Sequence, residues 1–172
     1  VPVPIAGPRN FGPHVTLPDG TTEMYQMLGI ASEDGMPVDD AQTVSLVVHE
    51  MAHSYVNPVF GKHRAELQSA GQQLFALVAQ QMRRQAYPAW EIMMNESGVR
   101  AVTALYMKEK KGVEAGATAV RAEVRNGFVW TNEFVELLRK YKRDRSTYAD
   151  LEAFVPKIVE LFDGPFRIAA GG

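Results

Sequence analysis

Two histidines and a glutamate, His49, Glu50 and His53, form a His-Glu-x-x-His motif. On a helix, residues four positions apart share one face, so both imidazoles can bind the same metal ion. Zinc suits such ligands, and a catalytic zinc site keeps one coordination position open. Glu50, one position after His49, is placed to take a proton from a water that the ion activates. The spacing therefore predicts zinc-dependent hydrolysis of the metalloprotease type.

The neighbours of this motif are apolar or small and uncharged from Val44 to Val56. Such neighbours predict a buried helix, and exclusion of water strengthens the electrostatic interactions of an active site. A helix that carried the same three residues on a solvent-facing side would have polar neighbours instead. We expect this helix to run from about Ala41 to Val56, because Asn57-Pro58 disfavours its continuation.

The composition is typical of a globular protein with a single domain, residues 1–172. With 18 basic and 20 acidic residues the formal net charge is -2, which argues against a nucleic-acid partner. There is no cysteine for a disulfide or a thiolate ligand, and no apolar run has the length of a membrane span. Because the chain opens on Val1, we expect a processed or partial chain. A secreted or periplasmic location, after removal of a signal segment, stays open. The sequence pattern predicts no particular oligomeric state.

The N-terminal part predicts strands. Pro18-Asp19-Gly20 separates two strand-like runs, His14–Leu17 and Thr21–Leu28, and this pattern is typical of a hairpin. Residues 1–13 are rich in Pro and Gly and are expected to be extended, and residues 30–40 to form a loop. The strand Thr22–Leu28 is either an edge along which a substrate peptide docks or a plain sheet strand.

The remainder of the chain predicts helices, with Gly112–Gly116 as a break and Pro156 as a kink or a late start of the last helix. Their expected ranges are Lys62–Gln85, Ala89–Lys110, Ala117–Val124, Asn132–Arg143 and Thr147–Phe162. Strands followed by helices predict the α+β class, with a small N-terminal antiparallel sheet or hairpin packed on a mainly helical body.

A catalytic zinc usually has three protein ligands, so a third ligand is expected downstream of His53. The metzincin pattern, with a histidine six residues after the second one, is excluded because that position is Val59. His63 lies between Lys62 and Arg64, whose charges repel a cation, and a surface histidine is the better interpretation.

Three glutamates are the acidic candidates for this ligand. Glu66 lies in the charged first turn of a predicted helix, where a carboxylate favours the helix dipole. Glu91 and Glu96 lie on the next helix, but only Glu96 has apolar and small neighbours on both sides. A buried carboxylate needs a partner, and both zinc and Arg100, one turn further on, qualify. A plain Glu96–Arg100 helix pair remains the alternative.

Three short blocks, in this order, resemble a bacterial family of proposed metallopeptidases, DUF4932. Val48–Pro58 resembles the His-Glu-Phe-Ser-His-Ser-Phe-x-Asn-Pro signature of that family, with Met51 and Ala52 as departures. Asn95–Ala101 is similar to its Glu-x-x-x-Arg-Ala block. Tyr141–Phe154 resembles its Tyr-x-x-x-Arg-x-x-Tyr element. The resemblance implies a zincin-like fold in which Glu96 is a gluzincin-type third zinc ligand, and it supplies no substrate.

A zinc peptidase also needs a hydrogen-bond donor for the oxyanion that forms on the substrate. Tyr148 is the first candidate and Tyr141 the second, with Arg145 as a nearby cation. The alternative is that both tyrosines are ordinary amphipathic core residues. Asn57 is expected to cap the motif helix or to bond the backbone of a ligand residue.

Three functions remain open at this point. The first is a zinc metallopeptidase that cleaves a peptide or protein substrate, with Glu50 as the general base. The second is a non-catalytic zincin-fold module that binds a peptide or protein, and the third is a helical protein with a chance motif. The complete set of two histidines, a downstream acid and Glu50 favours the first, because loss of catalysis usually erodes the base.

Overall fold

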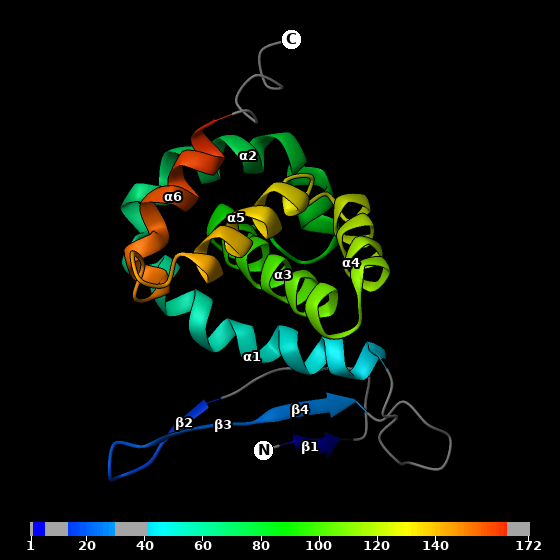
Figure 1. The fold of residues 1–172 in the computed structure, drawn as a ribbon, viewed down its shortest axis with the longest axis vertical. Coiled ribbons are helices and arrows are strands. Elements are labelled where there is room, and N and C mark those ends of the chain that lie inside the picture. The colour runs from blue at the N-terminus through cyan, green and yellow to red at the C-terminus, as the bar shows by residue number, and fades with distance from the viewer. Residues whose placement is uncertain (1, 6–13, 30–40, 165–172) are drawn as a thin grey trace. The chain divides into compact units, whose positions relative to one another are not determined.

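The structure is a computed structural model that describes residues 2–5, 14–29 and 41–164. In these residues four short strands precede six helices (Figure 1). The chain divides into two compact units, Val1–Tyr55 and Val56–Gly172. The boundary lies inside one continuous helix, α1 (Ala41–Lys62), which carries the His-Glu-x-x-His motif.

The strands of the first unit form two separate pairs. β1 and β4 are parallel, with Pro2 opposite Gln26, and β2 and β3 are antiparallel, with His14 opposite Met24. Their bounds are Pro2–Ile5 for β1, His14–Thr16 for β2, Thr22–Met24 for β3 and Gln26–Gly29 for β4.

A tight turn joins β2 to β3. The Leu17 backbone N–H donates to the Thr21 carbonyl at 2.8 Å, and Asp19 Oδ1 accepts from the Thr21 N–H at 2.9 Å. Gly20 has a φ of +84°, a left-handed conformation that glycine adopts without a steric penalty. The hydrogen bonds and the backbone conformation of this turn are therefore local, and they do not require a larger sheet.

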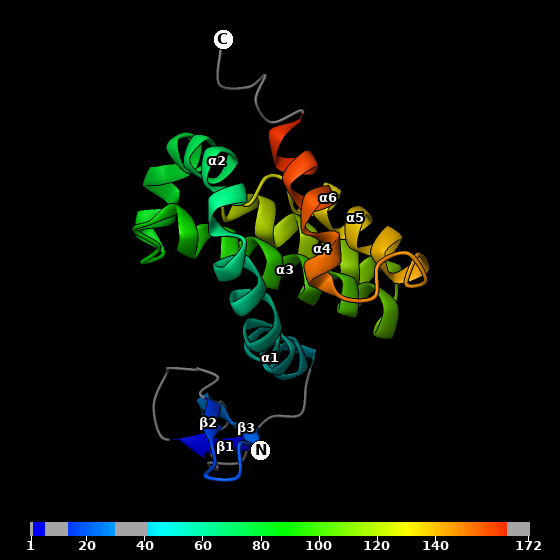
Figure 2. The ribbon, with the colours of Figure 1, turned by 90° about the vertical axis from the view of Figure 1, so that its left-hand side faces the viewer.

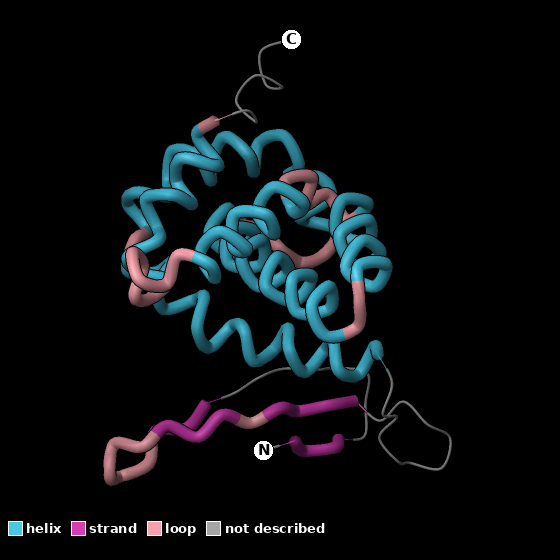
Figure 3. Tube along the Cα trace, viewed as in Figure 1, coloured by secondary structure: helices cyan, strands magenta, loops and turns pink. Residues whose placement is uncertain are grey.

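The predicted α+β class is wrong, because the described fold is almost entirely helical. Figure 3 shows helices over most of the described chain. Two strands alone bury too little apolar surface to form a stable layer, and Val15 on β2 is 48% exposed. The zincin-like fold implied by the resemblance is not supported either. The predicted loop 30–40 and most of the predicted extended segment 1–13 lie outside the described residues.

Helix α1 is longer than predicted. It continues through Asn57 and Pro58 to Lys62, although proline lacks the backbone N–H that a helix interior needs. Val56 and Phe60, on either side of Pro58, are 2% and 4% exposed. Burial of these two side chains outweighs the local cost of the proline, which explains why a rule based on sequence alone ends the helix too early.

Five further helices complete the second unit, and Figure 2 shows the same elements from the side. Of these, α2 and α3 are confirmed within a few residues of their predicted ranges. Helix α3 contacts α2, α4 and α5, and α6 contacts α2 and α5. Their bounds are Arg64–Arg84 for α2, Trp90–Lys110 for α3, Val113–Arg125 for α4, Thr131–Arg143 for α5 and Leu151–Asp163 for α6.

The predicted break over Gly112–Gly116 is only partly right. Gly112 turns the chain with a φ of +101°, but Gly116 lies inside α4. A Cβ on Gly116 would lie 2.7 Å from the Cα of Lys108, so its missing side chain lets α4 pack directly against α3. Helix α6 begins at Leu151, where Asp150 Oδ1 accepts from the Ala153 N–H at 2.8 Å, and Pro156 lies inside it.

Aromatic rings fill the core of the second unit. Trp130 contacts Phe128 and Phe162 edge to face, with ring centroids 6.2 Å and 6.1 Å apart, and Phe134 contacts Phe162 at 5.3 Å. All four rings are at most 1% exposed. Edge-to-face pairs stabilise a core beyond simple burial, so this cluster fixes α6 against α5 and the segment before it. The Trp130 ring N–H joins the cluster to Ser97 of α3. In the described part of the chain, no helix combines the length and the apolar character needed to cross a membrane.

Candidate metal centre

Helix α1 presents both motif histidines on one face. The rings of His49 and His53 are 5.0 Å apart between centroids, with an interplanar angle of 81°. The same face continues to Val56 and Phe60, which pack where a Cβ on Gly98 of α3 would lie 2.7 Å from Val56 Cγ1 and 3.1 Å from Phe60 Cζ. Val56 and Phe60 therefore lie in close contact with α3.

The third predicted ligand joins the two histidines. One ring nitrogen of His49, one of His53 and one carboxylate oxygen of Glu96 all lie within 4.8 Å of one another. Atoms bound to one tetrahedral zinc ion at about 2.1 Å lie about 3.4 Å apart, so a small adjustment would close the group around an ion. Two imidazoles and one carboxylate are also a donor set that catalytic zinc sites use. The residues present therefore fit zinc.

Glu96 is buried, with 7% of its surface exposed. Its neighbour Ser97 donates to the Met93 carbonyl at 2.7 Å and accepts from the Trp130 ring N–H at 2.9 Å. The Met93 bond holds the Ser97 hydroxyl in place, and the bond from Trp130 fixes the rotation of α3 about its own axis at the position of Glu96. The aromatic core thus sets the direction in which the carboxylate leaves the helix.

Arg100 holds the Glu96 carboxylate from the next turn of α3. Its Nε donates to Glu96 Oε2 at 3.1 Å, its Nη2 donates to the Tyr87 hydroxyl at 2.9 Å, and its Nη1 donates to Glu123. The guanidinium also lies over the Phe128 ring, 4.6 Å from the centroid. All three guanidinium nitrogens thus have a partner, so the plain helix pair is only one part of a larger network.

Tyr87 belongs to the same network. Burial first, and then the negative charge of Glu96, raise the pKa of the Tyr87 hydroxyl, while Arg100 opposes this change. Glu96 also acts on this pKa as a hydrogen-bond partner of the hydroxyl. The phenol therefore stays protonated at neutral pH, able to donate to Glu96 while it accepts from Arg100.

Tyr87 and Glu123 are site residues that the sequence pattern did not predict. Tyr87-Pro88 carried only a helix-breaking signal, and nothing in its spacing pointed to Arg100. Glu123 did leave a signal, because Arg100 and Glu123 stand at nearly equal distances before and after Gly112. In two antiparallel helices joined by a tight turn, such residues face each other, but the predicted break at Gly112–Gly116 obscured this symmetry.

Glu50 and Asn57 lie on α1 and are partly exposed. Each has an interaction within the protein. Glu50 follows His49 directly on the helix, so its role as general base stays a prediction. A capping role for Asn57 does not fit, because α1 continues to Lys62.

The other candidate ligands have partners of their own. Glu66 Oε1 lies 2.7 Å from His63 Nδ1 at the start of α2, and Glu91 Oε1 lies 2.6 Å from Arg64 Nη2. His63 is mostly buried, with 18% of its side chain exposed, rather than a free surface histidine as the sequence suggested. These contacts leave Glu96 as the acid that the described structure groups with His49 and His53.

The tyrosines proposed as oxyanion donors lie elsewhere in the helical unit. Tyr141 and Tyr148 both contact the Phe154 ring, with centroids 5.0 Å and 4.8 Å away, and Arg145 lies over the Tyr141 ring. Tyr148 lines a hollow of about 440 Å³ between α5 and α6. These contacts support the packing interpretation, and a catalytic role for either tyrosine stays a prediction.

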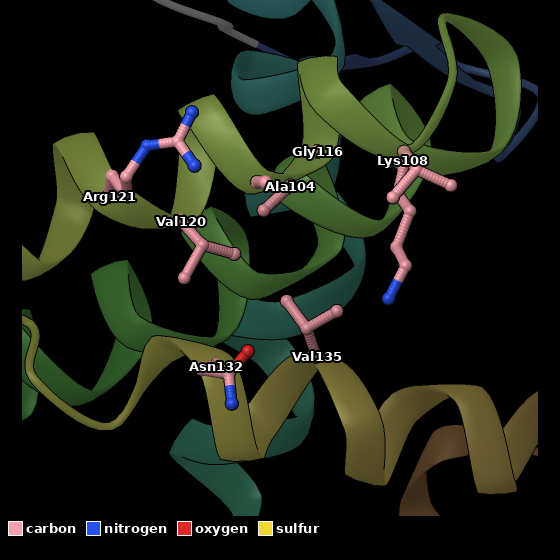
Figure 4. A pocket seen from close by; sticks show the side chains of 9 residues that line it. Ala104, Lys108, Gly116, Val120, Arg121, Asn132 and Val135 are labelled. Carbon is pink, nitrogen blue, oxygen red and sulfur yellow. The ribbon is translucent and has the colours of Figure 1, made fainter.

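A second hollow of about 230 Å³ lies among α3, α4 and α5 (Figure 4). Its walls include Ala104, Val120 and Val135, which point toward one another, with Lys108 and Arg121 at opposite sides. The Lys108 ammonium donates to Glu136 at 2.9 Å, and Arg121 donates to the Thr118 hydroxyl at 2.9 Å. The three candidate metal ligands, His49, His53 and Glu96, do not line this hollow.

Comparison with known proteins supports the resemblance that the motifs carry. No curated protein and no solved structure matches the chain. One family, described as a domain of unknown function, matches residues 1–161, which is most of the 172 residues. The match includes the complete donor group together with Glu50, Tyr87, Arg100 and Glu123. The chain therefore belongs to the DUF4932 family.

Proposed function

We propose that the protein is a zinc-dependent peptidase in which His49, His53 and Glu96 hold the ion and Glu50 is the general base. The observation that carries this proposal is the donor group itself, whose three ligand atoms lie within 4.8 Å of one another. The spacing of the motif predicted His49 and His53 as ligands, and the apolar surroundings of Glu96 predicted the third. The sequence pattern and the geometry thus favour the same three side chains.

The charges around Glu96 are a second support. Glu96, Arg100 and Glu123 are in contact, with side chains that are 9%, 12% and 20% exposed. One guanidinium lies between two carboxylates, so this poorly hydrated group is rich in negative charge. That charge would attract a divalent cation bound by Glu96 and the two imidazoles.

A zinc ion bound here would polarise the carbonyl of a peptide and lower the pKa of a water in the open position. Glu50 accepts a proton from the attacking water as its oxygen bonds to the carbonyl carbon. When the carbon–nitrogen bond breaks, Glu50 returns this proton to the leaving amine. Arg100 keeps Glu96 in one orientation through the Nε–Oε2 hydrogen bond.

The proposal is tested by metal content and by cleavage of a mixed peptide library, measured by mass spectrometry. We expect one equivalent of zinc in the purified protein, loss of cleavage with a chelator and its return with added zinc. His49→Ala should lose the metal. His63→Ala is the matched control and should keep it, because His63 pairs with Glu66 at the start of α2.

The outcomes separate the three functions that the sequence left open. Zinc binding without cleavage of any peptide would contradict catalysis and favour the binding module. Wild-type protein that takes up no zinc, or His49→Ala protein that takes up as much as the wild type, would contradict the metal centre altogether.

A further inference from the structure

Tyr87, in the connection between α2 and α3, is fixed by an unusual backbone. Ala86, the residue before it, has a φ of +65°, in the left-handed region that costs a residue with a Cβ about 1 kcal/mol. The Tyr87 N–H donates to the Met82 carbonyl at 2.9 Å, and the Ala86 N–H donates to the Arg83 carbonyl at 3.1 Å. This turn therefore fixes the backbone at Tyr87, and the contact of its hydroxyl with Arg100 places the side chain beside α3.

Tyr87, Arg100 and Glu96 form a closed set of contacts. Arg100 donates from Nε to Glu96 Oε2 at 3.1 Å and from Nη2 to the Tyr87 oxygen at 2.9 Å. Because the Tyr87 oxygen accepts from Arg100, its own proton is available to the Glu96 carboxylate, its second hydrogen-bond partner. Each of the three groups thus restrains the other two.

Glu123 completes this arrangement from α4. It binds the Nη1 of Arg100, and its Oε2 also accepts from the Asn126 side-chain amide at 3.2 Å. Arg100 is thus held by an acid on each side, one on its own helix and one on the next. Without Glu123, the full charge of Arg100 would act on Glu96 and compete with a cation for its oxygens.

We infer that Tyr87 and Glu123 are positioning residues of the metal centre, which hold Arg100 and Glu96 so that a Glu96 oxygen is directed toward His49 and His53. This inference rests on the proposed zinc site. Neither residue touches the ion or the substrate, and both act through Arg100 and Glu96. Partners of metal ligands that are placed in this way typically change metal affinity 10- to 100-fold when they are removed.

The experiment compares zinc affinity, measured by competition with a chromophoric chelator, in the full chain. Tyr87→Phe removes one hydroxyl, and Tyr106→Phe on α3 is its matched control. Glu123→Gln removes one charge, and Glu114→Gln at the exposed start of α4 is its control. We expect zinc to bind about 10- to 100-fold more weakly to Tyr87→Phe and Glu123→Gln, and equally to both controls.

Two further measurements distinguish positioning from a general loss of structure. The unfolding midpoint of the metal-free protein should be nearly the same for Tyr87→Phe and Tyr106→Phe. The visible spectrum of cobalt-substituted protein, which reports ligand geometry, should change in Tyr87→Phe and stay the same in Tyr106→Phe. If Glu123→Gln does not fold, the Tyr87→Phe comparison decides by itself.

Failure of this inference is distinct from failure of the proposed function. Tyr87→Phe protein that binds zinc as tightly as the wild type, while His49→Ala protein does not bind, would overturn the positioning role and leave the metal centre intact. Wild-type protein with no affinity for zinc would overturn both.

Discussion

Arg100 Nε donates at 3.1 Å to Oε2 of Glu96, which lies one helical turn earlier on α3. The two side chains are 12% and 9% exposed, so the pair is largely removed from water. A buried pair adds little when intact, because desolvation offsets the attraction, but loss of one partner leaves a buried charge behind. This asymmetry makes Arg100 the most sensitive position of the network.

Arg100→Met should strongly destabilise the metal-free protein. Methionine keeps the apolar packing but removes the charge that compensates Glu96 and Glu123. We expect a loss of about 3 kcal/mol in the free energy of unfolding, measured in urea at neutral pH. Arg64→Met is the matched control: it breaks the exposed pair with Glu91 and should cost less than about 1 kcal/mol. Equal losses in the two variants would contradict a buried network.

Gly98→Ala should move α1 away from α3. The new Cβ would lie 2.7 Å from Val56 Cγ1, closer than real Cβ contacts, so the protein must repack at a cost of about 1–3 kcal/mol. Because His53 lies one turn before Val56 on α1, zinc affinity should fall as well. Unfolding in urea and chelator competition measure the two effects.

Two further variants test whether the clash between the new Cβ and Val56 causes the loss of stability in Gly98→Ala. Val56→Ala removes the atom that clashes, so the double variant should lose less stability than the sum of the single variants predicts. Gly61→Ala, on the same helix, adds its Cβ to open space and should be neutral or slightly stabilising. Additive losses in the double variant would mean that the clash is not the cause.

Glu136 should titrate below its usual range. The hydrogen bond from Lys108, and then that from Arg139, lowers the pKa of this carboxyl below 4.5, although partial burial opposes the shift. Since the folded-state pKa lies below the unfolded one, ionised Glu136 stabilises the fold above about pH 4.5, and this contribution is lost as the pH falls through the folded-state pKa. Carboxyl chemical shifts in an NMR titration measure it directly.

Lys108→Met should return the Glu136 pKa toward its usual value, whereas Lys110→Met, at the exposed end of α3, should leave it unchanged. Because Glu136 is 44% exposed, its effect on stability should not exceed about 0.5 kcal/mol and should shrink with added salt. An unshifted pKa in the wild-type protein would show that the α3–α5 ion pair does not form in solution.

Parts of this fold are predictable because their signals are local. Helices α2 and α3 carry apolar residues at helical spacing, and Tyr87-Pro88 and Gly112 separate them from their neighbours. The end of α1 is not predictable in this way, because Pro58 argues for termination while the burial of Val56 and Phe60 depends on α3. Gly116 likewise suggests a break until its contact with Lys108 is known.

The candidate metal site likewise combines features that the sequence predicts with features that depend on packing between helices. The shared face of His49 and His53 follows from their spacing, and the apolar neighbours of Glu96 mark it as a carboxylate that needs a partner. Its approach to both histidines, and the contacts of Arg100 with Tyr87 and Glu123, depend on packing between α1, the α2–α3 turn, α3 and α4. Contacts of this kind produce no periodic pattern in a single sequence, so the sequence alone does not predict them.

Glu50→Gln is the variant that separates metal binding from catalysis. Glutamine has nearly the same size as glutamate but cannot accept a proton from water at neutral pH, so cleavage of a fluorogenic peptide should fall about 10²- to 10⁴-fold. Zinc content should stay at the wild-type level, because His49, His53 and Glu96 supply the ligands. Glu66→Gln, on α2 beside His63, is the control and should cleave normally. Activity that survives in Glu50→Gln would exclude it as the base, and loss of zinc together with activity would mean that Glu50 helps to hold the ion.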